Sequence, residues 1–403
     1  MNKTISIKSI VDSGLCIGCG LCEALSNNVT MQPATDGTLR PFPLDGFTSA
    51  EAELCAQVCP GIHVEPRNTE FANNIKTDDI WGHYQSMEYA WATNENTRFI
   101  SSTGGVLTAL GQYLLNSGQV KFIYHVKASS DQPLQSHACI SETAEQVLAG
   151  AGSRYAPVAP LNALTMALER NQPFAIIAKP CDMSALDNLA ACDNRIDTLI
   201  KYRLTLVCGG QSTATKAQQV LRANGIDESQ VTLYRHRGHG NPGPTRIESM
   251  NNPPAEISYQ DLWADEAGWA LESRCKLCPD ALGESADIAA ADVWPDGSPS
   301  GEDEGFNGII IRTDKGQQLI NDAVMAGYIT TGESITPDQF NDFQPHQVAK
   351  KISLKWRYLG LLRAGLPVIN APLSRLDTLG ERMPQAQRDR ETRGTLQRFK
   401  SPT

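Results

Sequence analysis

The spacing of its eleven cysteines constrains this chain more than any other feature. One group is compact: Cys16, Cys19 and Cys22 form the run Cys-Ile-Gly-Cys-Gly-Leu-Cys, and Cys55 and the dipeptide Cys59-Pro60 follow it. An odd number of cysteines cannot form a complete set of disulfides. Cysteines at motif spacings in a reducing compartment indicate metal or redox chemistry instead.

The compact group has the spacing of a bacterial ferredoxin, in which three close thiolates bind three irons of a four-iron cluster. Because the chain has one full triplet, we expect Cys59 to return as the fourth ligand and Cys55 to be a remnant or a reserve ligand. Gly18 and Gly20 allow the backbone N–H groups to point at the cluster sulfurs. Structural zinc sites favour two separated Cys-x-x-Cys pairs, so the spacing favours iron–sulfur over zinc. Residues 1–75 are therefore expected to be a small ferredoxin-like domain.

A second group of cysteines lies in the α/β pattern that follows. Apolar runs at 174–178 and 204–207 end at Lys179-Pro180-Cys181 and at Cys208, and each precedes a helical pattern. Parallel strands place ligand sites at their carboxyl ends, so we expect these cysteines to lie close together. With Cys275 and Cys278 they supply four thiolates, the complement of a second four-iron cluster. A thiol–disulfide pair is the alternative for Cys275 and Cys278, but no thioredoxin-like pattern surrounds them.

Two shorter motifs are candidate anion sites. A short strand is expected at 98–100, followed by the turn Ser101, Ser102, Thr103, Gly104 and Gly105 and a helix from Val106 to Gly118. Free N–H groups and hydroxyls at a helix start favour anions, although a plain N-cap of a core helix explains the turn equally well. Ser153-Arg154-Tyr155 could bind a phosphate or form a surface ion pair.

The rest of the chain is less specific. Residues 225–270, which include His236 and His239, are expected to be a long polar loop serving as a substrate lid, a metal loop or an ordinary connection. A strand at 308–312 and a helix at 315–326 extend the sheet. Residues 341–403 are expected to be a helical extension with a mobile end. The expected fold is thus α/β (α+β): the iron–sulfur domain, then a mixed-sheet flavin domain at 76–340, divided into parts at 76–160 and 161–340.

Bulk properties exclude several classes of protein. The formal charge of −10 argues against a nucleic-acid partner. No stretch reaches the roughly 18 to 20 apolar residues of a membrane span, and the first residues lack a signal-peptide pattern. These features predict a cytoplasmic protein; self-association is left open.

The motifs together resemble a known family, the beta subunits of deazaflavin-coenzyme-reducing hydrogenases and formate dehydrogenases. Relatives in that family include ferredoxin-dependent 7-hydroxymethyl-chlorophyll a reductase and 8-vinyl (proto)chlorophyllide reductase. The similarity spans about residues 10 to 330 and depends on motifs that occur in a fixed order: 101–106, 152–157, 179–181, 208–210, Cys275-x-x-Cys278, 286–288 and Asp292. Thr103 stands where the family often has a second serine, which keeps the hydroxyl.

The resemblance implies FAD beside two [4Fe-4S] clusters. It implies that Ser101 to Gly105 and Ser153 to Tyr155 surround the flavin, and that Cys181, Cys208, Cys275 and Cys278 hold the nearer cluster. Lys179 is a candidate partner of the flavin phosphate or ring, and Asp292 a candidate acid or structural cap. The substrate is not transferred by the resemblance.

The sequence therefore predicts an oxidoreductase that passes electrons from ferredoxin or a similar low-potential donor through both clusters to FAD and on to a small organic substrate. The first alternative is an electron-transfer beta subunit of a deazaflavin-linked hydrogenase or formate dehydrogenase complex. The second is a zinc-stabilised binding module without redox chemistry.

Overall fold

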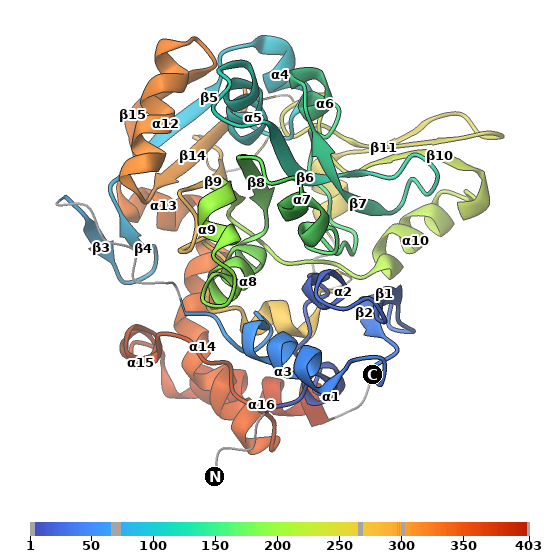
Figure 1. The fold of residues 1–403 in the computed structure, drawn as a ribbon, viewed down its shortest axis with the longest axis vertical. Coiled ribbons are helices and arrows are strands. Elements are labelled where there is room, and N and C mark those ends of the chain that lie inside the picture. The colour runs from blue at the N-terminus through green and yellow to red at the C-terminus, as the bar shows by residue number, and fades with distance from the viewer. Residues whose placement is uncertain are drawn as a thin grey trace.

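A large mixed sheet forms the centre of the protein (Figure 1). The computed structural model describes residues 5–65, 74–264, 269–295, 297, 299 and 303–400. Within these residues the central sheet has eight strands in the order β15-β5-β14-β13-β9-β8-β6-β7. Their bounds are β5 (Ser86–Ala92), β6 (Phe122–Ala128), β7 (Ser136–Ser141), β8 (Phe174–Ala178), β9 (Ile200–Leu206), β13 (Ile288–Val293), β14 (Phe306–Ile311) and β15 (Ile329–Ser334).

The middle of this sheet is parallel and its two edges are antiparallel. Strands β13, β9, β8 and β6 run in one direction, whereas β14, β5 and β15 on one side and β7 on the other alternate. The expected parallel pairing of 174–178 with the strand that ends before Cys208 is confirmed. Both Lys179 and Cys208 therefore leave the sheet at the same edge.

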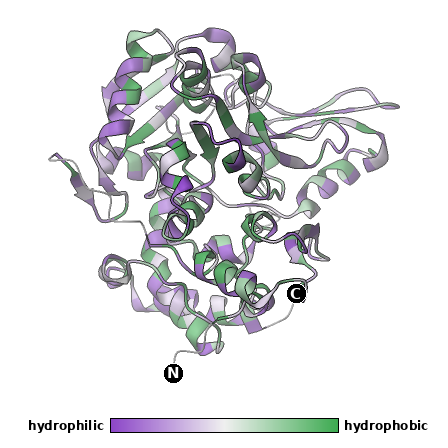
Figure 2. Cartoon of the chain, viewed as in Figure 1, coloured by the Kyte–Doolittle hydropathy of each residue, from purple (hydrophilic) through white to green (hydrophobic). Residues whose placement is uncertain are grey.

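Helices cover both faces of the sheet because alternate side chains of each buried strand point to opposite faces. One face packs on α5 (Val106–Asn116) and α12 (Asp314–Met325) through residues such as Leu110 and Leu319. The other packs on α8 (Pro180–Ala190) and α7 (Leu164–Glu169) through Phe174 and Ile176. Figure 2 shows apolar strands inside and polar helix faces outside. Four shorter helices accompany the sheet: α4 (Glu95–Ile100), α6 (Ala144–Leu148), α9 (Arg195–Leu199) and α13 (Pro337–Phe343).

The two ends of the chain share one core below the sheet. Ile10, Leu15 and Cys55 pack with Leu354 and Leu361 in a single apolar cluster. Figure 1 shows the first and last helices side by side in this lower layer. Its elements are α1 (Ile7–Asp12), α2 (Leu21–Ala24), β1 (Thr30–Pro33), β2 (Leu39–Phe42), α3 (Ser49–Val58), α14 (Pro345–Arg363), α15 (Leu373–Gly380) and α16 (Gln385–Lys400).

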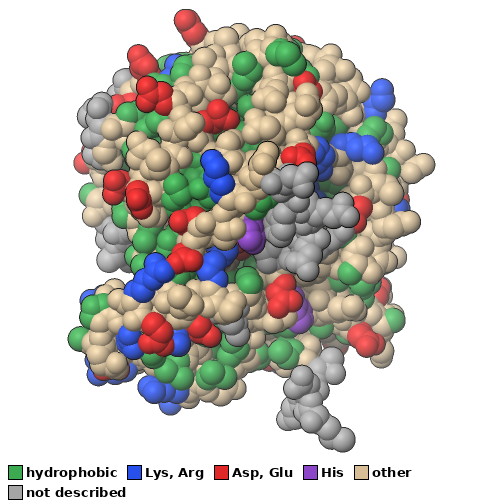
Figure 3. All heavy atoms as spheres, turned by 90° about the vertical axis from the view of Figure 1, so that its left-hand side faces the viewer, with side chains coloured by type: hydrophobic (Ala, Val, Ile, Leu, Met, Phe, Trp, Pro, Cys, Tyr) green, Lys and Arg blue, Asp and Glu red, His purple; other side chains and the backbone are tan. Residues whose placement is uncertain are grey.

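Charged side chains on the outside of this layer are largely paired. Figure 3 shows Lys and Arg beside Asp and Glu on the lower part of one face. Pairs of this kind join Lys355 to Glu381 and Arg388 to Glu381. Exposed pairs of this type stabilise a fold by about 0 to 1 kcal/mol each, so they add solubility more than stability.

Two local expectations were wrong. Residues 98–100 end helix α4, because the Asn94 side chain accepts the Thr97 N–H at 2.9 Å and caps the helix. The segment 225–270 is not a structureless loop where it is described. It contains η1 (Glu228–Gln230), β10 (Val231–Arg235), β11 (Thr245–Ser249), β12 (Ala255–Ile257) and α11 (Tyr259–Ala264), and it packs on α10 (Ala214–Ala223). The tail forms helices α15 and α16 up to Lys400, and the residues beyond it lie outside the described part of the chain, so the expected mobile end stays a prediction.

The small hairpin of β3 (Lys76–Asp78) and β4 (Gly82–Tyr84) joins the lower layer to the sheet. Trp81 in its turn is fully buried, and its indole N–H donates to Asn341 Oδ1 at 2.9 Å. Its ring packs on Phe340 of α13, with centroids 4.9 Å apart. This contact holds the β3–β4 hairpin against the side of the molecule that contains the sheet.

Candidate functional site

The N-terminal cysteines converge as the ferredoxin spacing predicts. Cys59 lies within electrostatic reach of the three thiols of the triplet. Cys55 instead hydrogen bonds with Cys22 and lies near Cys59. All five are free thiols. Cys59 is thus the better placed of the two for the fourth position, and Cys55 lies beside it.

The backbone around these sulfurs is arranged for thiolates. N–H groups of Gly18, Leu21 and Gly61 donate to Cys16, Cys19 and Cys59 respectively. Such donors stabilise negative sulfur and are typical of iron–sulfur ligation. Gly20, with φ of 84°, makes the close approach possible: a Cβ there would lie 2.9 Å from the Asn162 backbone nitrogen.

Burial opposes the same thiolates. It raises the pKa of Cys59 to about 12, aided by the nearby Cys16, and the pKa values of Cys16 and Cys19 are also raised, chiefly by burial. Buried thiolates need a compensating cation, and the irons of a cluster are such cations. The donor set therefore fits an iron–sulfur cluster.

The second group also converges, from three separate segments. Cys181 is at the second position of α8, Cys208 follows β9, and Cys275 and Cys278 lie in and directly after the 3₁₀ helix η2 (Ser273–Leu277). Cys181 and Cys208 interact electrostatically with each other and with Cys278, and Cys275 does so with Cys208 and Cys278. The sheet edge and the η2 loop thus bring the predicted quartet together.

This quartet has the same chemical character as the first group. The N–H of Gln211 lies 3.4 Å from Cys275 Sγ, and the N–H of Gly210 donates to Cys208. Burial and the neighbouring Glu272 raise the pKa of Cys275 to about 12. The start of α8 adds the positive end of a helix dipole beside Cys181.

Within the described ranges, no three His, Cys, Asp or Glu side chains are close enough to hold one metal ion. On a single zinc, thiolates about 2.3 Å from the metal lie roughly 3.8 Å from each other. A four-iron cluster places a separate iron under each thiolate and so separates the sulfurs more widely. The zinc-stabilised module stays a prediction.

A buried arginine connects the two cysteine groups. Arg274, next to Cys275, is 1% exposed, and its guanidinium donates to the Gly61 and Pro60 carbonyls at 2.7 and 3.0 Å. These carbonyls directly follow Cys59. The loops that carry the last cysteine of the first group and the first cysteine of the η2 pair are thus held side by side.

Helix α14 supplies functional contacts that no sequence motif indicated. Its side chains donate to the carbonyls of residues 208–209 and 276–279, which flank three of the four cysteines of the second quartet. The bonds are Gln347 to Cys208 at 2.8 Å, Lys350 to Gly209 at 3.2 Å, Lys351 to Pro279 at 2.5 Å, Arg357 to Lys276 at 2.7 Å and Tyr358 to Leu277 at 3.2 Å. The C-terminal extension therefore fixes both cysteine loops.

The predicted turn and Asp292 lie together around an arginine that the sequence analysis missed. Arg237, 2% exposed, donates to Asp292 Oδ2 at 2.6 Å, to the Tyr155 hydroxyl at 3.0 Å and to the Ser102 carbonyl at 2.8 Å. Thr103 Oγ1 donates to the other oxygen of Asp292 at 3.1 Å. Burial opposes the charged guanidinium, but the adjacent carboxylate outweighs it and raises the pKa of Arg237.

Most polar groups of the turn are already used within the chain. Asn307 Oδ1 accepts the Val106 N–H at 3.2 Å, and Ser102 Oγ accepts the Ser153 N–H at 2.6 Å. A Cβ at Gly104 would lie 2.6 Å from the Asn307 backbone nitrogen, so this glycine is required for packing. These contacts are those of a buried helix start, the plainer of the two interpretations of the turn.

Two predicted cofactor residues lie apart from Asp292. The Arg154 guanidinium donates to Ser136 Oγ at 3.0 Å and to the Tyr234 carbonyl at 3.1 Å. Lys179 lies among the cysteines rather than beside the turn. The structure thus divides the predicted set into an Arg237–Asp292 cluster and a cysteine region.

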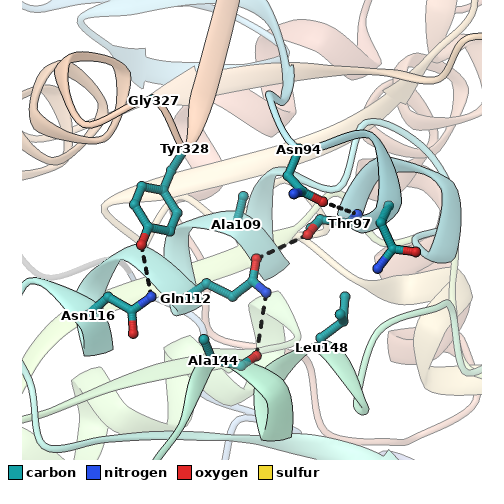
Figure 4. A pocket seen from close by; sticks show the side chains of 10 residues that line it. Asn94, Thr97, Ala109, Gln112, Asn116, Ala144, Leu148, Gly327 and Tyr328 are labelled. Carbon is teal, nitrogen blue, oxygen red and sulfur yellow. Dashed lines mark hydrogen bonds between the residues drawn. The ribbon is translucent and has the colours of Figure 1, made fainter.

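The cavities on the described surface lie away from these residues. A pocket of about 390 Å³ is lined by α4, α5 and α6 (Figure 4). Two of its amides are bonded to hydroxyl groups: Gln112 Oε1 accepts from Thr97 Oγ1 at 3.2 Å, and Asn116 donates to the Tyr328 hydroxyl at 2.8 Å. A second cavity of about 10 Å³ lies near Trp269. Neither touches the 101–105 turn, and FAD stays a prediction.

The His236–Gly243 segment is docked rather than poised as a lid. The N–H of Gly240 donates to the Phe99 carbonyl at 2.9 Å, and the N–H of His239 to the Ile100 carbonyl at 3.3 Å. Burial lowers the pKa of His236 to about 3, so this imidazole is neutral near pH 7. Its role as a proton donor is weakened accordingly.

Comparison with known families decides the classification. The model of the C-terminal region of the coenzyme F420 hydrogenase/dehydrogenase beta subunit matches residues 172–336, and the model of the N-terminal region matches residues 87–165. The chain belongs to this beta-subunit family. The matched segments contain the second quartet and the Arg237–Asp292 cluster, whereas the N-terminal cysteines and helix α14 lie outside them.

Curated relatives agree with the family. The coenzyme F420-dependent sulfite reductase of Methanocaldococcus jannaschii is 27% identical over 330 residues, 78% of this chain and 47% of that protein. The F420-dependent formate dehydrogenase 1 subunit beta of Methanococcus maripaludis is 27% identical over 61% of each chain. The chain thus spans about half to three fifths of these two relatives. Relatives of this kind support a redox role in general terms.

A solved structure supports the fold. A chain of the F420-reducing [NiFe] hydrogenase complex from Methanosarcina barkeri superposes with a TM-score of 0.54 at 20% identity, covering 68% of this chain and 92% of that one. The predicted mixed α/β architecture is thereby confirmed. In the described part of the chain, no helix is long and apolar enough to cross a membrane.

Proposed function

We propose that this chain is an iron–sulfur electron-transfer unit of a coenzyme F420-linked oxidoreductase. The observation that carries the proposal is the convergence of Cys181, Cys208, Cys275 and Cys278 from three segments into one half-buried quartet beside the N-terminal cysteines. When bound, four-iron clusters would supply one-electron transfer. The chain itself supplies the thiolates, the N–H donors and the dry surroundings.

The relatives favour this interpretation over a free-standing reductase with its own organic substrate. Two of the matched relatives are named beta subunits of F420-dependent formate dehydrogenase and of coenzyme F420 hydrogenase, and a third is an F420-dependent sulfite reductase. All three names contain the deazaflavin coenzyme F420. We therefore propose a deazaflavin as the two-electron partner and another protein subunit as the one-electron partner.

The chain's own residues suggest where each partner acts. Asp292 is the more exposed member of the Arg237–Asp292 cluster, with 34% of its side chain accessible against 3% for Arg237. It lies at the carboxyl end of β13, the edge where α/β sheets bind ligands. We propose this edge for the deazaflavin, with Arg237 holding the Asp292 carboxylate in place. The N-terminal cysteines would face the partner subunit.

Iron analysis of anaerobically purified protein tests the cysteine assignment. We expect roughly eight irons and eight sulfides per chain, and about half that iron in Cys275→Ala with the fold retained by circular dichroism. Cys192→Ala is the matched control, because Cys192 is exposed and lies outside both groups; its iron content should be unchanged. Unchanged iron in Cys275→Ala would remove Cys275 from the ligand set, and colourless protein with zinc would refute the proposal.

A coupled assay tests the coenzyme. Two equivalents of a reduced viologen dye should reduce one deazaflavin by two electrons, with protons taken from solvent, and bleach its visible absorption. Asp292→Asn should lower this rate at least tenfold while leaving iron content unchanged. A protein with full iron that reduces no deazaflavin but transfers electrons to an organic acceptor would instead favour the free-standing reductase.

A further inference from the structure

Lys179 has an unusual environment for a lysine next to a strand end. Its Nζ lies 3.4 Å from Asp182 Oδ2, an ion-pair distance, but has no hydrogen-bond partner within the described residues. Asp182 is 0% exposed; its Oδ2 accepts the Lys179 backbone N–H at 2.9 Å, and its Oδ1 is also unpartnered. A buried charged pair thus retains unused donors and an unused acceptor, which is costly unless another group uses them.

Thiols of both cysteine groups act electrostatically on this pair. Burial opposes the ammonium, but Asp182, Cys181, Cys208 and Cys19 together outweigh it and raise the pKa of Lys179. Asp182 in turn acts on Cys19 and on Cys181. The pair therefore lies where the first group and the second quartet meet, closer to the second.

The other buried cations at this junction are committed elsewhere. The Arg274 guanidinium donates to the Gly61 and Pro60 carbonyls. The Arg40 guanidinium donates to the Leu39 carbonyl at 2.8 Å and to Glu272 at 3.3 Å. Of these three cations, Lys179 alone lacks a hydrogen-bond partner for its charged group among the described residues.

We propose that Lys179 is a positioning residue for electron transfer between the two cysteine groups. With a centre bound there, its ammonium would donate to thiolate sulfur of the second quartet, and its charge would favour the reduced state of that centre. Reduction adds one negative charge to a centre, and a nearby cation in a water-poor site stabilises that charge. The inference rests on the proposed function. One electron moves from the first group to the second, and Lys179 keeps its proton.

Reduction potentials measured on the anaerobic holoprotein test this. In Lys179→Met the potential of the second centre, identified as the electron paramagnetic resonance signal lost in Cys275→Ala, should fall. The expected shift is at least tenfold in the ratio of reduced to oxidised centre, or 59 mV for a one-electron couple. The first centre should shift less. Lys179→Arg should restore most of the potential, and Lys355→Gln, a surface lysine paired with Glu381, should leave both centres unchanged.

A second variant keeps the proposal falsifiable if Lys179→Met loses its iron. Asp182→Asn keeps a side-chain acceptor for the Lys179 N–H but removes the negative charge, so both potentials should rise. Unshifted potentials in whichever of the two variants retains full iron would overturn the role of Lys179 and leave the proposed function intact. Wild-type protein without cluster signals would instead overturn the proposed function.

Discussion

At the scale of single residues, the positions of buried charged side chains depend on contacts that no local sequence pattern indicates. Arg237 is one arginine in a glycine-rich segment, yet it is the residue that joins Asp292, Tyr155 and Ser102. The cysteines are different, because their spacing along the sequence is itself typical of iron–sulfur ligands. The sequence therefore predicted which thiols converge but could not predict which cations accompany them.

His125 gives a pH prediction away from the cysteines. Burial, and to a lesser degree Lys127, lower its pKa from 6.5 to about 4, and its Nε2 lies 2.7 Å from Ser141 Oγ. Between these values the unfolded chain binds the proton more tightly than the folded one, so stability falls as pH decreases below 6.5. At pH 5.5 the loss from this group is about 1 kcal/mol.

Urea unfolding at pH 7.5 and 5.5 checks this expectation. His125→Gln should lose less stability between the two pH values than wild type, by about 1 kcal/mol. His137→Gln, an exposed position on the paired strand, should behave much more like wild type. An equal loss in wild type and His125→Gln would show that this histidine does not contribute.

At the scale of elements, strongly patterned segments were predictable and weakly patterned ones were not. The strand 174–178 was predicted with its observed bounds, because a short apolar run between turn residues permits little else. The run at 98–100 was misassigned, since three residues carry no periodicity and the Asn94 cap decided the helix. Helix α16 was missed because it is polar nearly throughout and is held by packing on α14.

The contact between α14 and α16 depends on a small residue. A Cβ at Gly360 would lie 2.7 Å from the Thr392 carbonyl oxygen and 2.7 Å from Thr395 Cβ. Gly360→Ala should therefore destabilise the protein by about 1 to 3 kcal/mol despite the better helix propensity of alanine. Gly394, in α16, has open space around it, so Gly394→Ala should be neutral or more stable by up to about 1 kcal/mol.

Thermal unfolding of the two variants gives the comparison. We expect a lower midpoint for Gly360→Ala and an equal or higher one for Gly394→Ala. Since both changes add the same methyl group to a helix, their difference isolates the helix contact. Equal midpoints would mean that α16 does not pack on α14 as the structure has it.

At the scale of the whole molecule, the expected division into consecutive units is less informative than the contacts between them. The predicted 1–75 and 341–403 segments contribute to one apolar cluster, which also includes Leu277 beside Cys278. Sequence order could not reveal this, because the two segments are separated by the entire sheet. The motifs along the chain nevertheless indicated the four cysteines that the fold brings near one another, and their role as cluster ligands stays a prediction.

Removing residues 341–403 tests this joint core. The change would expose the cluster around Ile10 and Leu15 and take away the α14 donors to the 208–209 and 276–279 carbonyls. We expect soluble yield to fall at least tenfold relative to the full chain, measured by expression and size-exclusion chromatography. A soluble, monodisperse truncated chain with full iron content would contradict it.

The shared core of the two chain ends has a consequence for biosynthesis. Cys16, Cys19 and Cys22 are translated before α14 to α16, the helices that help enclose them. At 5 to 20 residues per second, the interval is roughly 15 to 65 s. During that time the thiols of the triplet lack the part of their enclosure that α14 to α16 provide, so the nascent polypeptide leaves them open to solvent and to other molecules.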